Sequence, residues 1–146
     1  MITDIFLRCS TDQAITATAV STDKIDLGTA RDIGEGKPLY MVFTVTQTFL
    51  TLTSLTFNIV TDDDAALGSP TVRTSTGAIT LASGGLAAGK QYALQIPPMI
   101  GSLGERYLGA TYTVGGSSAT AGKVTCDIVE TIQDGTKYYA SGFTVI

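Results

Sequence analysis

The sequence predicts an all-β domain, and three features of the chain support this prediction. Apolar and polar residues alternate with a period of two along much of the chain, which is typical of strands with one buried face. Turn signals containing glycine separate these stretches at short intervals, as in a sandwich or barrel. Threonine, whose branched Cβ favours extended backbone, occurs 24 times among 146 residues. A chain of this length is expected to form a single domain over residues 1–146.

Six stretches alternate clearly enough to be predicted as strands. In the first of them, Met41, Phe43 and Val45 share one face and threonines occupy the other. The six stretches are residues 41–48, 54–61, 91–96, 107–114, 124–132 and 143–146. Weaker patterns at residues 15–20, 71–74 and 78–82 bring the expected total to about eight or nine strands.

The alternation also predicts one hairpin and the core of the domain. Asp134-Gly135 is the sharpest turn signal, because a type I′ hairpin needs a positive φ angle at both central residues. We expect it to join the strand that ends at Ile132 to one that begins near Lys137. A shift of one residue would turn threonines inward, so the buried face is well defined. The expected core residues are Phe43, Val45, Leu55, Phe57, Ile59, Leu94, Leu108, Cys126 and Ile128.

Two segments outside the strand patterns are predicted to contact a partner. Residues 1–14 show no clear period, so we expect a short N-terminal arm there, and apolar side chains on an arm usually dock against something. Deletion of residues 1–10 should then weaken assembly without unfolding the domain. The stiff apolar segment at residues 96–100, which contains Pro97-Pro98, fits either a strand end or sheet corner or an exposed apolar contact. The predicted contact residues are Ile2, Ile5, Phe6, Leu7, Pro97 and Pro98.

The composition argues against an enzyme and against a nucleic-acid-binding protein. Only 15% of the residues are charged and the net charge is −4, so the chain has no excess of basic groups for phosphates. It contains no histidine, which is the commonest general base and metal ligand. We therefore expect no catalysis and no cofactor. The apolar run Ile5–Leu7 is too short for a signal peptide or a spanning helix, so we expect no membrane insertion.

Three short motifs could carry chemistry, and their surroundings favour structural roles. Residues 21–24 match S-x-x-K, but they lie in a turn-like segment without the companion motifs of penicillin-recognising enzymes. Residues 62–64 are three consecutive aspartates, which favours a solvated loop and leaves binding of Ca²⁺ open. Cys9 and Cys126 lie at opposite ends of the chain, and we expect two reduced thiols, with Cys126 buried.

Six segments of the chain carry a resemblance to a known family. They are residues 12–22, 30–34, 38–46, 96–98, 106–110 and 121–125. Taken in order and at matching spacing, they are similar to the capsid cement proteins of tailed bacteriophages, of the Bordetella-phage type. The similarity runs from Met1 to Ile146. This resemblance implies a jelly-roll-like β-sandwich that binds the outside of an icosahedral shell and ties neighbouring capsid subunits together.

The residues and the resemblance together lead to one expected function. We expect a single-domain, jelly-roll-like antiparallel β-sandwich with a short N-terminal arm that acts as a non-enzymatic capsid decoration protein. Its expected partners are the major capsid protein and further copies of itself, as a dimer in preference to a trimer. It would fold in the host cytoplasm and be displayed on the virion. The alternative is a receptor- or carbohydrate-binding module of a phage tail, which exposed aromatic residues such as Tyr138-Tyr139 would favour.

Overall fold

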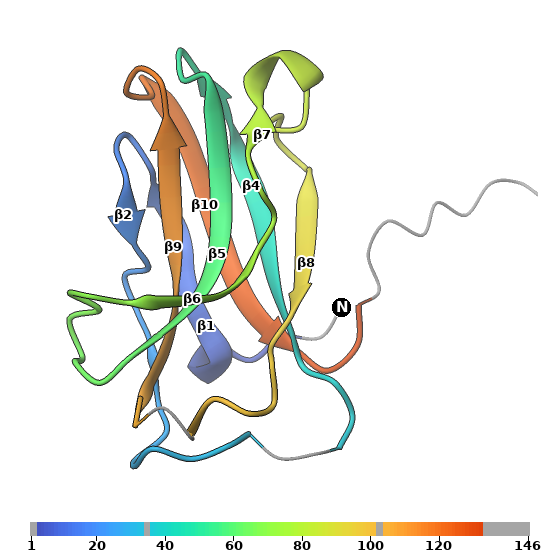
Figure 1. Ribbon diagram of the computed structural model, residues 1–146. Helices are drawn as coiled ribbons and strands as arrows, with labels where there is room; N and C mark the ends of the chain where they lie inside the picture. The colour runs from blue at the N-terminus through green and yellow to red at the C-terminus, as the bar shows by residue number, and fades with distance from the viewer. Residues whose placement is uncertain (1–2, 34–35, 102–103, 133–146) are drawn as a thin grey trace, which may run out of the picture.

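Two antiparallel β-sheets packed face to face make up the protein, as the computed structural model shows (Figure 1). The structure describes residues 3–33, 36–101 and 104–132. The strands are β1 (Arg8–Ala14), β2 (Ala19–Val20), β3 (Ile25–Asp26), β4 (Tyr40–Leu50), β5 (Ser54–Asp62), β6 (Thr71–Ser75), β7 (Ile79–Thr80), β8 (Gln91–Gln95), β9 (Tyr107–Gly115) and β10 (Ala121–Val129). Two 3₁₀ turns lie wholly within the described ranges, η1 (Ile5–Leu7) and η2 (Leu81–Ser83). The all-β prediction is therefore confirmed.

The strand order shows how the chain builds the two layers. One sheet has the order β1-β10-β4-β8, and the other has the order β2-β9-β5-β6 with β3 on β9 and β7 on β5. If the short β3 and β7 are set aside, successive strands change sheet at every connection except the one between β5 and β6. This order interleaves early and late strands of the chain in both sheets.

The predicted strands differ from the observed ones mainly in their bounds. Five of the clear alternations correspond to β4, β5, β8, β9 and β10. The last of these ends at Val129 and not at Ile132, because the chain bends at Glu130 and Thr131. The weak pattern at residues 15–20 yields a strand only at Ala19–Val20, and β3 was not anticipated. The Asp134-Gly135 hairpin and the strand at 143–146 lie outside the described residues.

The prediction of an arm over residues 1–14 is wrong for its second half. Residues Arg8–Ala14 form β1, which pairs with β10 at the edge of the four-stranded sheet. Its register with β10 shifts between Arg8 and Ser10 and again between Ser10 and Gln13, and Asp12 has a φ angle of 44°. Each shift moves the side chains out of a simple two-residue period. The alternation that would have revealed the strand is therefore absent from the sequence.

The core between the two sheets contains nearly all of the residues predicted for it. All nine are buried except Leu94, which is half-buried because β8 is an edge strand. The rings of Phe43 and Phe57 stack with their centroids 5.0 Å apart, and Tyr112 meets both edge-on. Further fully buried side chains lie outside or at the ends of the predicted strands and were missed; they are Ile15, Phe49, Leu86 and Ile100.

Candidate docking surface

The sheet register brings the two predicted contact segments to the same end of the molecule. Arg8 pairs with Asp127, Val129 with Tyr40, and Tyr40 with Gln95. The strands β1 and β4 therefore begin where β8 and β10 end, at the bottom of Figure 1, and we call this the lower end. Residues 5–7 precede β1 and residues 97–98 follow β8, so both segments lie here. Ile2 lies outside the described residues.

The turn η1 holds three apolar side chains in solvent. The carboxylate of Asp4 accepts the N–H of Phe6 at 3.0 Å, and the carbonyl of Asp4 accepts the N–H of Leu7 at 3.0 Å. The exposed fractions are 72% for Ile5, 85% for Phe6 and 40% for Leu7. Exposed apolar side chains grouped in this way are typical of an interaction site.

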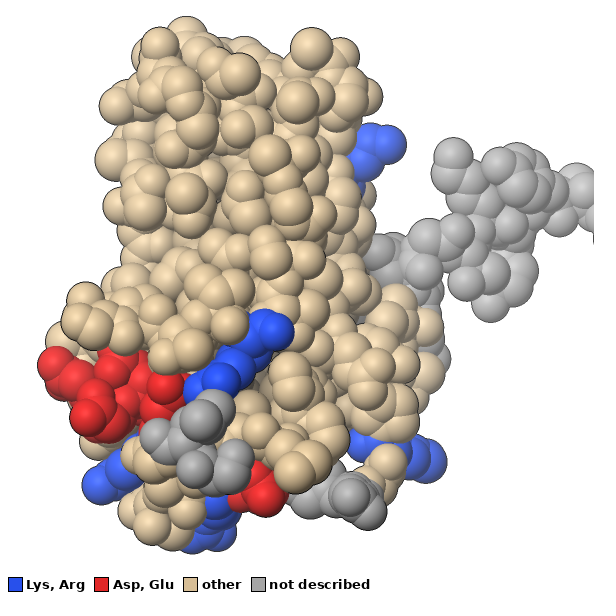
Figure 2. Space-filling view, in the orientation of Figure 1, with Lys and Arg blue, Asp and Glu red and all other residues tan. Residues whose placement is uncertain are grey.

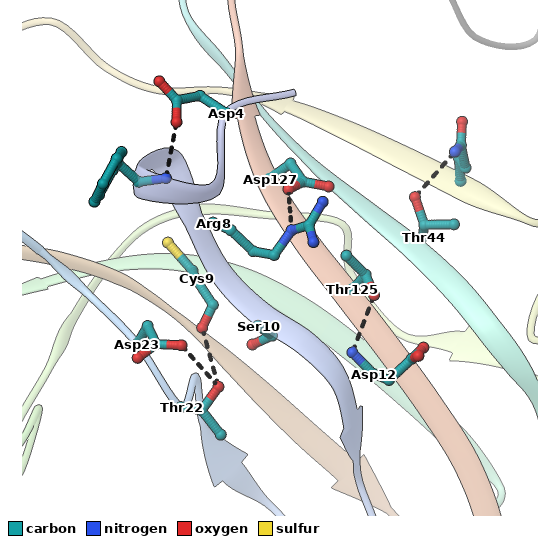
Figure 3. Close-up of polar contacts among 12 residues, drawn as sticks. Asp4, Arg8, Cys9, Ser10, Asp12, Thr22, Asp23, Thr44, Thr125 and Asp127 are labelled. Atoms are coloured by element: carbon teal, nitrogen blue, oxygen red, sulfur yellow. Dashed lines mark hydrogen bonds and ion pairs between the residues drawn. The ribbon is translucent and has the colours of Figure 1, made fainter. Parts of the chain in front are cut away.

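An ion pair fixes this turn to the sheet. The Nε of Arg8 donates to the carboxylate of Asp127 at 2.7 Å, as Figure 3 shows. The side chain of Asp127 is nearly buried, whereas that of Arg8 is partly exposed. Since Arg8 directly follows the turn, the apolar side chains are displayed from a fixed backbone. A fixed backbone lowers the entropic cost of binding a partner.

A groove with largely apolar walls opens at the same end. Its volume is about 600 Å³, and its lining residues are Ile33, Gly36, Lys37, Pro38, Leu39, Gln95, Ile96, Pro98 and Glu130. The walls are held together by backbone hydrogen bonds from Ile96 to Leu39 and from Ile33 to Pro98, both 2.9 Å long. Of the two predicted prolines, Pro98 is exposed and lines the groove, and Pro97 is half-buried.

Several of the charged groups at the lower end pair with one another. Charged atoms gather at this end of the face drawn in Figure 2, apart from one basic group higher up. The guanidinium of Arg106 donates twice to Asp26, at 2.5 and 2.6 Å. Hydrogen bonds from Arg106 and then from the N–H of Gly28 lower the pKa of Asp26 to about 2. Lys37 and Glu130 form an exposed ion pair of 2.9 Å at the groove.

A network of hydrogen bonds and an ion pair surrounds Glu105, the residue before Arg106. Its carboxylate accepts hydrogen bonds from Thr61 and Thr71 and forms an ion pair with Arg73. Burial acts to raise the pKa of Glu105, but these hydrogen bonds and the charge of Arg73 together hold it below its ordinary value. The network joins β5 to β6 and stabilises the fold at this end.

The chemical motifs of the sequence have structural roles here. The buried carboxylate of Asp62 accepts the N–H groups of Asp64 and Ser69 at 3.1 and 3.0 Å, so it closes its own loop. The hydroxyl of Ser21 donates to the carbonyl of Asp23 and accepts the N–H of Ala110. In the described ranges no three His, Cys, Asp or Glu side chains are placed to hold a metal ion. None of the helical turns in those ranges is long and apolar enough to cross a membrane.

Comparison with known proteins gives the family. Residues 9–128 match the family model described as Bbp16, which is most of the chain. The chain belongs to the Bbp16 family. The name of the Bbp16 family indicates a Bordetella phage protein. A search of curated proteins finds no match.

The Bbp16 match covers the framework of the sandwich but not all of the candidate surface. It begins in β1 and ends in β10, so it includes strands of both sheets. The groove residues Ile33, Leu39 and Ile96 lie within the match, whereas the η1 turn lies before it. Sequence reasoning found Pro98 and included Ile96 in the same apolar segment, but it missed Ile33 and Leu39. Only the pairing of β4 with β8 and the backbone hydrogen bond from Ile33 to Pro98 bring them together.

Proposed function

We propose that this protein is a non-enzymatic capsid cement protein that binds the outer shell of a phage and bridges neighbouring major capsid subunits. The observation that carries the proposal is the η1 turn, which presents Ile5, Phe6 and Leu7 from a fixed backbone in a member of a phage family. An apolar surface of this kind suits a permanent structural contact, and the fold itself is common to many functions.

The proposed mechanism is weak binding repeated by symmetry. Full burial of one large apolar side chain is worth roughly 1.5–3 kcal/mol, and part of that offsets the entropy lost on association. One copy of the turn would therefore bind a capsid subunit weakly. A copy that contacts two subunits, or an oligomer that presents several turns, gains affinity by avidity. Because the bound protein favours the assembled shell over separated subunits, it stabilises the shell by mass action.

The proposal includes the partners and the location. The protein would act without a cofactor, associate with the major capsid protein, and form homo-oligomers, as a dimer in preference to a trimer. It would fold in the host cytoplasm and be displayed on the outside of the virion. The low content of charged residues is compatible with contacts that are mainly apolar and hydrogen-bonded.

Copy number on the particle tests the proposed function. Purified protein is mixed with expanded shells that lack it, the shells are sedimented, and the bound protein is quantified against the major capsid protein. We expect saturation near one copy for each capsid subunit. A handful of copies on each particle would indicate a tail component instead, and no binding to shells would remove the cement role.

A further inference from the structure

The two cysteines, far apart in the sequence, lie in the same part of the core. Cys9 is in β1 and Cys126 is in β10, and these strands are neighbours in the four-stranded sheet. Both side chains are completely buried, and both belong to the cluster that fills the space between the sheets. Both thiols are free in this structure.

A β-bulge places Cys9 beside Cys126. Arg8 pairs with Asp127 and Ser10 pairs with Cys126, so Cys9 is the extra residue at the register shift. Arg8 and Asp127 form their ion pair on the outer side of the sheet, whereas Cys9, Ser10 and Cys126 are all buried. Two residues of the bulged strand thus oppose the single residue Cys126.

The contacts around Cys9 hold this arrangement in place. The carbonyl of Cys9 accepts the N–H of Asp23 at 2.8 Å and the hydroxyl of Thr22 at 3.4 Å, the latter drawn in Figure 3. The hydroxyls of Ser10 and Tyr112 are 2.7 Å apart. Burial raises the pKa of the Cys126 thiol well above its ordinary value, and hydrogen bonding with Cys9 raises it further. This influence agrees with the neighbouring positions that the strand register gives the two cysteines.

We propose that Cys9 and Cys126 form an intramolecular disulfide when the folded protein meets a small-molecule disulfide. The thiolate of one cysteine attacks a sulfur of the reagent, forms a mixed disulfide and releases one small thiol. The thiolate of the second cysteine then attacks the protein sulfur of that mixed disulfide and releases the second small thiol. The two cysteines lose two protons and two electrons in total, and the reagent takes up both.

The position of β1 explains how a buried pair can react. As an edge strand with two register shifts, β1 has β10 as its partner in the four-stranded sheet and can separate from it without opening the other pairs. Cys9 would be exposed first and would make the first attack. We therefore expect slow oxidation that becomes faster in mild denaturant.

The cross-link would change the stability of the region that carries the apolar turn. It would tie β1 covalently to the interior of the sheet and close a very long loop in the unfolded chain, which is the case in which a disulfide constrains the unfolded state most. This inference does not depend on the capsid role, so the two can fail separately.

The experiment uses the wild-type chain of 146 residues and oxidised glutathione at mildly alkaline pH, with and without a sub-denaturing concentration of urea. After alkylation under denaturing conditions, intact mass spectrometry counts the remaining thiols. We expect a monomer that has lost two hydrogen atoms and resists alkylation, with a melting temperature higher by about 5 °C or more that dithiothreitol reverses. Cys9→Ala and Cys126→Ala are the matched controls, and neither should show the reversible shift.

Three results would overturn the proposal. The first is two alkylated thiols after oxidation even in urea, which would mean that the sulfurs cannot pair. The second is a stable adduct with glutathione that does not resolve. The third is a covalent dimer on a non-reducing gel, which would assign the reaction to different molecules.

Discussion

Gly122 shows how one residue without a side chain permits the packing of the core. Its φ angle is 139°, a value that residues with a Cβ rarely adopt, and an added Cβ would overlap the ring of Phe49. That ring is completely buried. We expect Gly122→Ala to lower the free energy of unfolding by about 3 kcal/mol or more, because backbone strain and overpacking act together.

Urea denaturation of a matched variant isolates the packing effect. Gly89 also has a positive φ angle, of 88°, but an added Cβ there would meet nothing within 4 Å. Gly89→Ala should therefore cost only about 1 kcal/mol, from backbone strain alone. Equal losses in the two variants would show that contact with Phe49 is not what requires a glycine.

Glu105 should make the stability of the fold depend on acid pH. Its pKa is lower in the folded protein than its ordinary value of 4.5, so its ionised form favours the folded state. This stability is fully present above the ordinary pKa and is lost as the pH falls toward the lower folded pKa. We expect the free energy of unfolding to drop as the pH falls below the ordinary pKa of 4.5.

Glu105→Gln tests the origin of that pH dependence. Because it removes the partner of the nearly buried Arg73, it should cost about 2 kcal/mol at neutral pH. The variant should also lose less stability than the wild type on acidification, when both are followed by urea denaturation. A variant with an unchanged acid slope would assign the effect to other carboxylates.

At the scale of single elements, the η1 turn should affect binding without affecting folding. Phe6 is mostly exposed and makes its hydrogen bond through the backbone, so Phe6→Ser should leave the melting temperature unchanged. If η1 docks on the shell, the same change removes roughly 1.5–3 kcal/mol from each contact and should weaken binding by at least about tenfold. Sedimentation of shells over a range of protein concentrations measures this.

The control for this turn lies on the other sheet. Val72 of β6 is also an exposed apolar residue, so Val72→Ser removes a similar surface elsewhere. We expect shell binding by this variant to equal that of the wild type. Equal weakening in both variants would mean that general surface hydrophobicity, and not the turn, governs binding.

The structure shows that a shorter deletion than residues 1–10 is needed to test the N-terminal arm. Removing residues 1–10 would delete Cys9 and Ser10, which are buried in β1, and we now expect that truncation to destabilise the sandwich. Removing residues 1–7 takes away the apolar turn and leaves β1 intact. Circular dichroism melting of the two truncations distinguishes these expectations, because only the longer deletion should lower the melting temperature substantially.

The elements that could be predicted from sequence are those with one face on the core and an unbroken register. In β4 and β5, Phe43 and Phe57 follow the two-residue period because one side of each strand faces the opposite sheet. In β1 the register shifts remove that period, so no sequence pattern marks the strand. The exposed turn was predicted because its apolar residues fit no strand, whereas the groove depends on pairings between distant segments.

At the scale of the whole molecule, the distribution of charge bears on how binding should respond to salt. The strands β4, β8 and β9 contain no charged residue, and Asp26, Lys37 and Arg73 at the lower end all have partners within the chain. Charged residues make up only 15% of the chain, so apolar and hydrogen-bonded contacts can predominate in binding. We expect shells carrying the protein to release packaged DNA at a temperature several degrees higher than bare shells, and salt to reduce this difference only modestly.

Heat release of DNA measured over a range of salt concentrations checks both parts of that expectation. Identical release temperatures with and without the protein would remove the stabilising role. Complete dissociation at moderate salt would leave the role intact but show that ion pairs, and not apolar contacts, hold the protein on the shell.

The pairing of β1 with β10 affects how the protein folds during its synthesis on the ribosome. Arg8 and Asp127 are 119 positions apart, and β10 lies between β1 and β4 in the sheet. Until β10 has been synthesised, β1 has no neighbour in its sheet and one side of β4 is unpaired. Contacts between such distant positions form slowly and only once both partners exist. The nascent chain should therefore remain unfolded until β10 has left the exit tunnel. The two sheets should pack together only after that.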